Sequence, residues 1–63
     1  MQEHQLRVIE EEKEISLKLV ALHKFFTTDT WQSLPIDEKY LLLDQGEVMG
    51  RYIAILQQRI ARF

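Results

Sequence analysis

The sequence predicts an all-α protein, an antiparallel two-helix hairpin with a short helical turn in its connection, assembled into a homo-oligomeric helical bundle. Two long stretches carry apolar residues at alternating spacings of three and four, which is typical of helices that pack along one face. Turn-forming residues separate the two stretches. All 63 residues are expected to form one domain, with helices over about residues 2–27 and 35–61 and a connection over about 28–34.

The first helix is predicted by a seven-residue repeat without glycine or proline. Its inward positions form two interleaved rows: Val8, Ile15 and Leu22, and Glu12, Leu19 and Phe26. Glu12 is the one polar member, and we expect it to find a partner such as Arg59 or a tyrosine hydroxyl. Favourable ion pairs four residues apart support the helix: Glu3 with Arg7 and Glu14 with Lys18.

The connection is predicted from side chains that compete with the backbone for hydrogen bonds, in the run Thr27 to Thr30. Asp29 is expected to cap a short helical turn, and Pro35 to be the first residue of the next helix. A connection this short makes the long helices antiparallel. Trp31 has two open interpretations: it closes the end of the hairpin, or it is an exposed aromatic anchor for a partner.

The second helix is predicted to present a seam with the same alternating spacing: Leu42, Gln45, Met49, Tyr52, Leu56, Arg59 and Phe63. Gln45, Tyr52 and Arg59 interrupt it at seven-residue intervals. They either form interhelical polar pairs that fix the register or contact a ligand. Gly46 and Gly50 are either two tolerated glycines or a smooth strip that another helix or a flat ligand can approach.

Self-association is expected because a chain this short has difficulty stabilising itself, and it has no cysteine or metal cluster to help. Each long helix also carries more apolar surface than one neighbour can cover. We therefore expect at least a dimer. The expected interface positions are Val8, Ile15, Leu19, Leu22, Phe26, Leu41, Leu42, Met49, Leu56 and Ile60.

Composition and motifs exclude several functions. A net charge of −2 argues against binding to duplex nucleic acid or to an anionic membrane. The chain has no signal-peptide pattern and no apolar run long enough to span a bilayer, so a cytoplasmic location is expected. No catalytic motif is present, and His4 and His23 lie about 28 Å apart along one helix. We expect neither an enzyme nor a metal or cofactor site.

The remaining polar and aromatic groups suit ligand recognition. Arginine offers a planar donor fork for phosphate, and aromatic rings can stack on bases. The candidate ligand-binding residues are His4, Arg7, Trp31, Gln45, Arg51, Tyr52, Arg59 and Arg62.

Four short motifs follow one another along the chain. They are M-x-x-H-Q-x-R-V from Met1, L-P-x-x-E-K from Leu34, L-L-x-Q-x-x-x-M-x-x-Y from Leu42, and L-x-x-R-I-A-x-F from Leu56. In this order they resemble a family of short uncharacterised tailed-phage proteins named after a member from a crAss-like phage. That resemblance implies a phage accessory protein made in the bacterial cytoplasm.

In size and helicity the chain is also similar, more loosely, to small helical-hairpin phage proteins that sequester cyclic nucleotide signals of CBASS and Thoeris defence. This similarity implies a counter-defence protein that binds a cyclic oligonucleotide as an oligomer, without turnover. The alternative is an interaction module that inhibits a host defence protein through an exposed apolar helix face. A purely structural oligomer is the third possibility.

Overall fold

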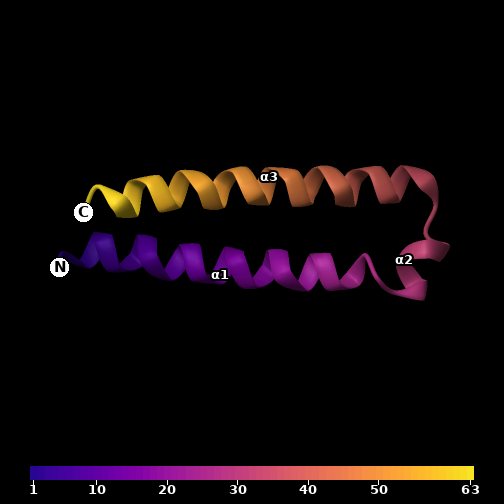
Figure 1. Cartoon of the computed structure of the whole chain (residues 1–63), viewed down its shortest axis with the longest axis horizontal. Coiled ribbons are helices and arrows are strands. Elements are labelled where there is room, and N and C mark those ends of the chain that lie inside the picture. The colour runs from indigo at the N-terminus through magenta and orange to yellow at the C-terminus, as the bar shows by residue number, and fades with distance from the viewer.

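The computed structural model describes all 63 residues and shows a hairpin of three helices. The helices are α1 (Glu3–Phe25), α2 (Asp29–Ser33) and α3 (Ile36–Ala61). The two long helices run antiparallel, so the chain ends lie at the same end of a rod of 46 × 15 × 13 Å (Figure 1). We call this the open end, and the end that holds α2 the loop end. The prediction of an all-helical hairpin with a helical turn in its connection is confirmed.

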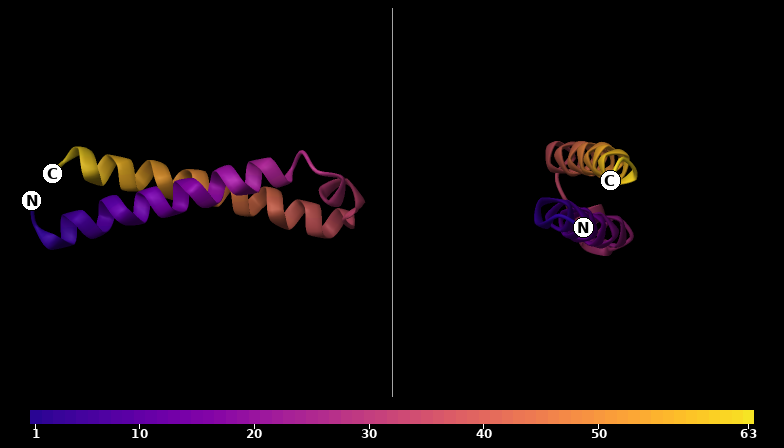
Figure 2. Two further views of the ribbon diagram at one scale, coloured as in Figure 1. Left: turned by 90° about the horizontal axis from the view of Figure 1, so that it is seen from below. Right: turned by 90° about the vertical axis from the view of Figure 1, so that its left-hand side faces the viewer.

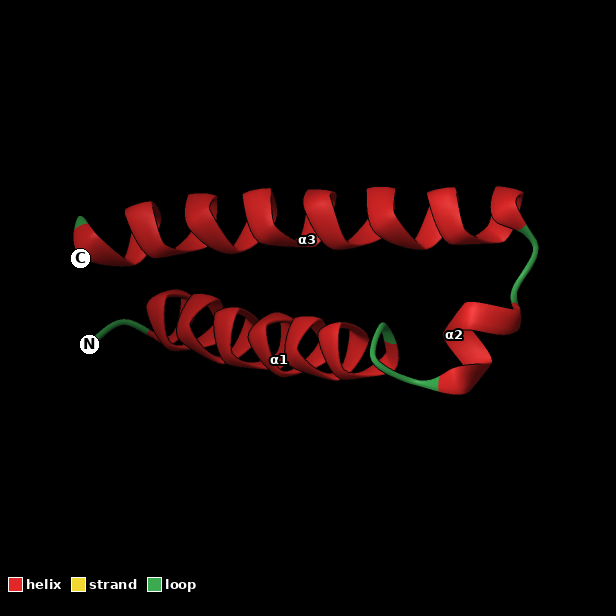
Figure 3. Cartoon of the chain, turned by 45° about the vertical axis from the view of Figure 1, so that its right-hand side comes forward, coloured by secondary structure: helices red, strands yellow, loops and turns green.

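The axes of the two long helices are inclined to each other, so the helices cross near the middle of the hairpin when it is seen from below (Figure 2). Only short loops separate the three helices, and no strand is present (Figure 3). No helix combines the length and apolar character that crossing a bilayer requires.

The first turn of α1 is held by local polar contacts. The backbone N–H of Gln2 donates to Gln5 Oε1 at 3.0 Å, and Arg7 Nη2 lies 2.8 Å from Glu3 Oε1. The ion pair expected between these two residues is confirmed. Glu14 and Lys18 do not form the second expected pair, which is consistent with the small energy of exposed pairs.

Thr28, and not the expected Asp29, is the N-cap of α2. Its backbone is extended, so its Oγ1 can accept from the Trp31 backbone N–H at 3.2 Å. Asp29 follows as the first helical residue, where its charge complements the helix dipole. Pro35 likewise has an extended ψ of 150° and precedes α3 rather than beginning it. Both corrections shift a helix start by one residue.

α1 faces α3 through the rows expected from the sequence, because all six members of the two rows are half-buried. The expected partner of Glu12 is wrong. Its Oε1 accepts from Ser16 Oγ at 2.9 Å and from Gln57 Nε2 at 3.3 Å, and not from Arg59 or a tyrosine. An amide reaches the carboxylate because Gln57 lies on the side of α3 that is turned toward α1.

α3 faces α1 through a seam that differs from the expected one. Its half-buried or buried members keep the alternating spacing: Lys39, Leu42, Gly46, Met49, Ile53, Leu56 and Ile60. Leu56 is the only fully buried residue of the chain. The expected seam alternated the same leucines and methionine with Gln45, Tyr52 and Arg59, and these three are exposed. That part of the prediction is wrong.

The physical reason lies in which of the two flanks of α3 packs against α1. The observed orientation covers Ile53 and Ile60 and leaves the amide of Gln45 and the guanidinium of Arg59 in water, which avoids their desolvation. Gly46 also lets the backbones approach closely, since a Cβ there would lie 3.3 Å from Leu22 Cδ2. The hairpin thus turns its polar heptad positions outward.

Candidate functional site

The loop end is closed by an aromatic cluster. The ring centroids of Trp31 and Phe26 lie 4.5 Å apart, and Phe25 meets Trp31 edge-on at 6.4 Å. Lys39 Nζ lies 5.8 Å from the centre of the indole. Trp31 is half-buried in this cluster, as the first interpretation of this residue expected. Its ring is therefore occupied by contacts within the chain.

The open end gathers four of the candidate ligand-binding residues. His4 and Arg7 lie in the first turns of α1, and Arg59 and Arg62 lie where α3 ends, so the antiparallel arrangement brings them to one end (Figure 1). All four are exposed. Arg7 is paired with Glu3, whereas Arg59 and Arg62 have no carboxylate within 4.0 Å. Two arginines at this end thus remain available to an anionic group.

The outward flank of α3 holds the three remaining candidates, Gln45, Arg51 and Tyr52. Val48, Arg51, Tyr52 and Ile55 line a shallow depression of about 320 Å³. Gln45 lies on the same flank one turn before Val48, and its Nε2 is 3.9 Å from Met49 Sδ. Arg51 and Tyr52 therefore lie beside the apolar side chains of Val48 and Ile55, an arrangement that suits a ligand or a protein partner.

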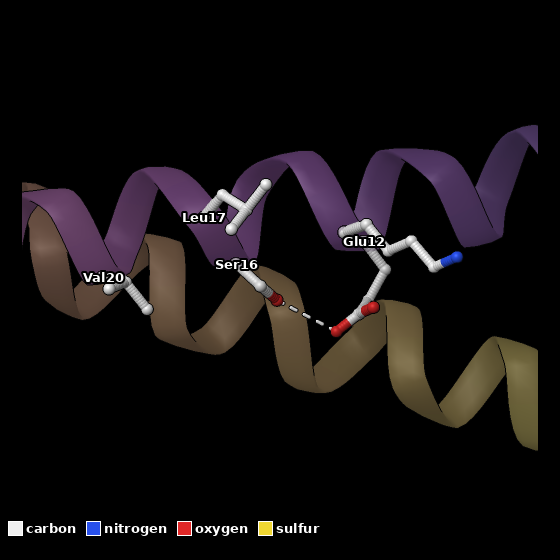
Figure 4. Close-up of a pocket in the computed structure, with 5 residues that line it drawn as sticks. Glu12, Ser16, Leu17 and Val20 are labelled. Atoms are coloured by element: carbon white, nitrogen blue, oxygen red, sulfur yellow. Dashed lines mark hydrogen bonds between the residues drawn. The ribbon is translucent and has the colours of Figure 1, made fainter.

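A second depression lies on α1, and it was not predicted from the sequence. It has a volume of about 380 Å³ and is lined by Glu12, Lys13, Ser16, Leu17 and Val20. Figure 4 shows the hydrogen bond from Ser16 to Glu12, with Leu17 and Val20 on the other side of Ser16. One sequence feature could have predicted this depression: the small Ser16 lies close to Leu17 and Val20, two apolar residues that do not belong to the seam of α1.

The candidate ligand-binding residues therefore occupy separate places along one chain. Trp31 belongs to the loop end, Arg51 and Tyr52 to the middle of α3, and the arginines at positions 59 and 62 to the open end. The rod is 46 Å long, so one small ligand cannot touch all of them in a single chain. A site that uses both ends requires more than one copy.

The expected interface positions are mostly used inside the hairpin. Nine of the ten are half-buried or buried on the faces that α1 and α3 turn toward each other, and Leu41, at 64% exposure, is the exception. Other apolar side chains remain largely exposed, among them Leu17 at 70% and Val48 at 64%. Any surface for self-association is therefore built mainly from residues outside the two seams.

Comparison with known proteins gives two matches. The family model described as Sequestin matches residues 2–62. An uncharacterized 7.5 kDa protein in the denB–rIIB intergenic region of Enterobacteria phage T4 is 38% identical over 60 residues, which cover 95% of this chain and 94% of the relative. No solved structure matches the chain. The likeness to short phage proteins is confirmed, while neither match carries the crAss-like phage name.

Proposed function

The chain belongs to the Sequestin family, and from that membership we propose that it is a phage accessory counter-defence protein. In this proposal it binds a nucleotide-derived immune signal, such as a cyclic oligonucleotide, as an oligomer and holds it without turnover. The family name denotes sequestration, and the relative from phage T4 supports a phage origin. Binding alone also fits a chain in which no catalytic motif was found.

The observation that carries the proposal is the pair of unpaired arginines at the open end. Arg59 and Arg62 extend from the last turns of α3 with no carboxylate within 4.0 Å. A guanidinium can bind a phosphate through two parallel hydrogen bonds, and it keeps its charge at every physiological pH. His4 lies at the same end and can add a donor. These groups suit the phosphates of a nucleotide.

The need for an oligomer follows from the shape of the chain. Sites for small molecules are concave and bury most of the ligand surface. Both depressions of the single chain are shallow and lie on one helix each. A second copy would supply the missing walls of a pocket and further charged groups.

Thermal unfolding with a panel of nucleotides tests the proposal. Cyclic di- and trinucleotides are the main arm, and NAD⁺ and ADP-ribose test other molecules that carry adenine and phosphate. At one hundred times its Kd, a ligand stabilises the folded chain by about 2.7 kcal/mol, which raises the melting temperature by several degrees. We expect at least one such shift. Mass spectrometry of the ligand released by heating should recover it unchanged.

Two variants localise the ligand. Arg59→Ala and Arg62→Ala should each weaken binding about tenfold or more, because each removes a charge-assisted hydrogen-bonding group. Lys18→Ala is the matched control, since it removes an exposed cation from the middle of α1. No shift with any nucleotide, or equal losses in all three variants, would refute the proposal.

The depression on α1 favours a second candidate, a module that binds a helix of a host protein. Leu17 and Val20 expose apolar surface there, and Lys13 lies beside them. This candidate expects one stoichiometric host partner in a pull-down that Leu17→Ser abolishes. The nucleotide-dependent shift in melting temperature should be absent from the wild type in that case.

A further inference from the structure

α3 carries a second apolar face that α1 does not cover. Its members are exposed at 64%, 64%, 39% and 55%, and we call them the outer stripe: Leu41, Val48, Tyr52 and Ile55. Their spacings of seven, four and three residues place them on one side of the helix, as in a coiled-coil seam. The depression between Val48, Arg51, Tyr52 and Ile55 lies within this stripe. A helix can therefore pack along it.

The chain exposes more surface than a compact protein of the same mass, and the excess matches the area that one partner buries in a stable dimer. The chain exposes 5076 Å², and it has a mass of 7.6 kDa. A compact monomer of this mass exposes about 4,300 Å². The excess of about 800 Å² equals the area that each partner typically buries in an interface of standard size. A single further interface of ordinary size accounts for it.

The charges on α3 change sign along its length. Asp37 and Asp44 precede Arg51 at steps of seven, so the three lie in one row on the flank of the outer stripe. Neither aspartate forms an ion pair in the chain, and Arg51 is also unpaired. Two antiparallel copies related by a two-fold axis bring this flank of both helices together and place acid against base, whereas a parallel two-fold pair would turn the row toward the opposite flank of the partner, so that Asp44 and Arg51 would not meet. The partner that fits this face is therefore the same helix in the opposite direction.

We propose that two copies of the chain pack α3 against α3 in antiparallel orientation, with Val48 on the two-fold axis. This register places Leu41 against the partner's Ile55 and Gln45 beside the partner's Tyr52. It also places Asp44 opposite the partner's Arg51, because an antiparallel two-fold axis brings the same flank of both helices together. Each position on the stripe then meets a complementary one. This dimer would provide the second copy that the proposed function requires, but the interface itself depends on no ligand and can be tested without one.

Sedimentation equilibrium at micromolar concentration gives the first measurement. We expect twice the chain mass of 7.6 kDa, or a larger assembly built from such pairs. Val48→Glu should raise the dimer Kd at least 100-fold, because two carboxylates then meet at the axis. Leu17→Glu, which introduces the same charge on α1, is the control and should leave the mass unchanged. Circular dichroism should show that both variants remain helical.

A charge exchange tests the orientation. Asp44→Arg should raise the dimer Kd at least tenfold, because it places two guanidinium groups opposite each other. Adding Arg51→Asp to the same chain should restore the original Kd. If Asp44→Arg weakened the dimer only by disturbing the fold of the chain, Arg51→Asp would not restore the Kd. The variant Val48→Cys should also form a disulfide-linked dimer under mild oxidation, and Leu17→Cys should not.

Each outcome decides the proposal. A wild-type monomer at tens of micromolar would overturn it, and so would an assembly that Val48→Glu leaves intact. Failure of the double exchange to restore the Kd would overturn the antiparallel register. Loss of nucleotide binding in Arg62→Ala with an unchanged mass would leave the interface supported, since Arg62 lies beyond the end of α3.

Discussion

Gly46 of α3 faces Leu22 of α1 so closely that a Cβ atom at position 46 would lie 3.3 Å from Leu22 Cδ2. Leu19 and Phe26 would each have a side-chain atom 4.0 Å from it. Gly50 is one turn further along α3, and a Cβ there would have nothing within 4 Å. Of the two glycines, only the first is required by the contact between the helices.

Alanine substitutions should separate the two glycines. Gly46→Ala should lower the free energy of unfolding by about 1 kcal/mol, because its Cβ crowds Leu22 and pushes α1 away. Gly50→Ala should raise it by about 1 kcal/mol, because a Cβ there meets nothing within 4 Å and alanine is favoured over glycine in a helix interior. Urea unfolding at one protein concentration measures both. Equal stability of the two variants would contradict the close approach at Gly46.

Trp31 should contribute most of the stability of the loop end. Trp31→Ala should lower the free energy of unfolding by about 2 kcal/mol, since it removes a half-buried indole from its contacts with Phe25 and Phe26. Gln32→Ala, on the exposed side of α2, should change it little. Unfolding followed by circular dichroism at 222 nm is suitable because it does not depend on the tryptophan signal. A loss no larger than that of the control would mean that Trp31 does not hold this end.

Thr28 joins the end of α1 to the start of α2. Its Oγ1 donates to the carbonyl of Phe25 at 2.6 Å and accepts from the backbone N–H of Trp31 at 3.2 Å. Thr28→Ala should therefore cost about 1 kcal/mol of unfolding free energy. Thr28→Ser should recover most of it, and Thr30→Ala should have little effect. If serine is no better than alanine, the hydroxyl does not act as the cap.

Glu12 is a charged residue within an otherwise mostly apolar seam. Its two hydrogen bonds, from Ser16 and Gln57, come from side chains that can also reach water. Glu12→Leu should therefore raise the free energy of unfolding by about 1 kcal/mol through added apolar contact. Glu11→Leu, on the exposed face, is the matched control and should leave it unchanged. A decrease in the Glu12 variant would show that the carboxylate network stabilises the hairpin.

Much of the fold was predictable from the sequence because local preferences and the apolar repeat agree. The inward face of α1 followed from the regular spacing of Val8, Ile15 and Leu22. The connection followed from threonine side chains and Pro35. At the helix ends, the sequence failed only at single capping positions, where neighbouring residues such as Thr28 and Asp29 have nearly equal preferences.

The candidate site was predictable only as a set of residue types. Arginine, histidine and aromatic side chains suggested a ligand, and the hairpin then distributed them over its two ends and the outer flank of α3. Trp31 became part of the packing, and Arg59 and Arg62 remained exposed. Sequence spacing does not reveal this separation, because it depends on which parts of two helices lie side by side.

The sequence by itself determined two amphipathic helices, their antiparallel connection and the seam of α1. Only the tertiary structure decided which flank of α3 meets α1, since Leu42, Met49 and Leu56 can be extended into a seam on either side. The observed side contains Gly46, which contributes no hydrophobic signal and yet allows α3 to approach Leu22 of α1 closely. As a consequence, Gln45, Tyr52 and Arg59 point away from α1, on the flank that we propose for a second copy of the chain.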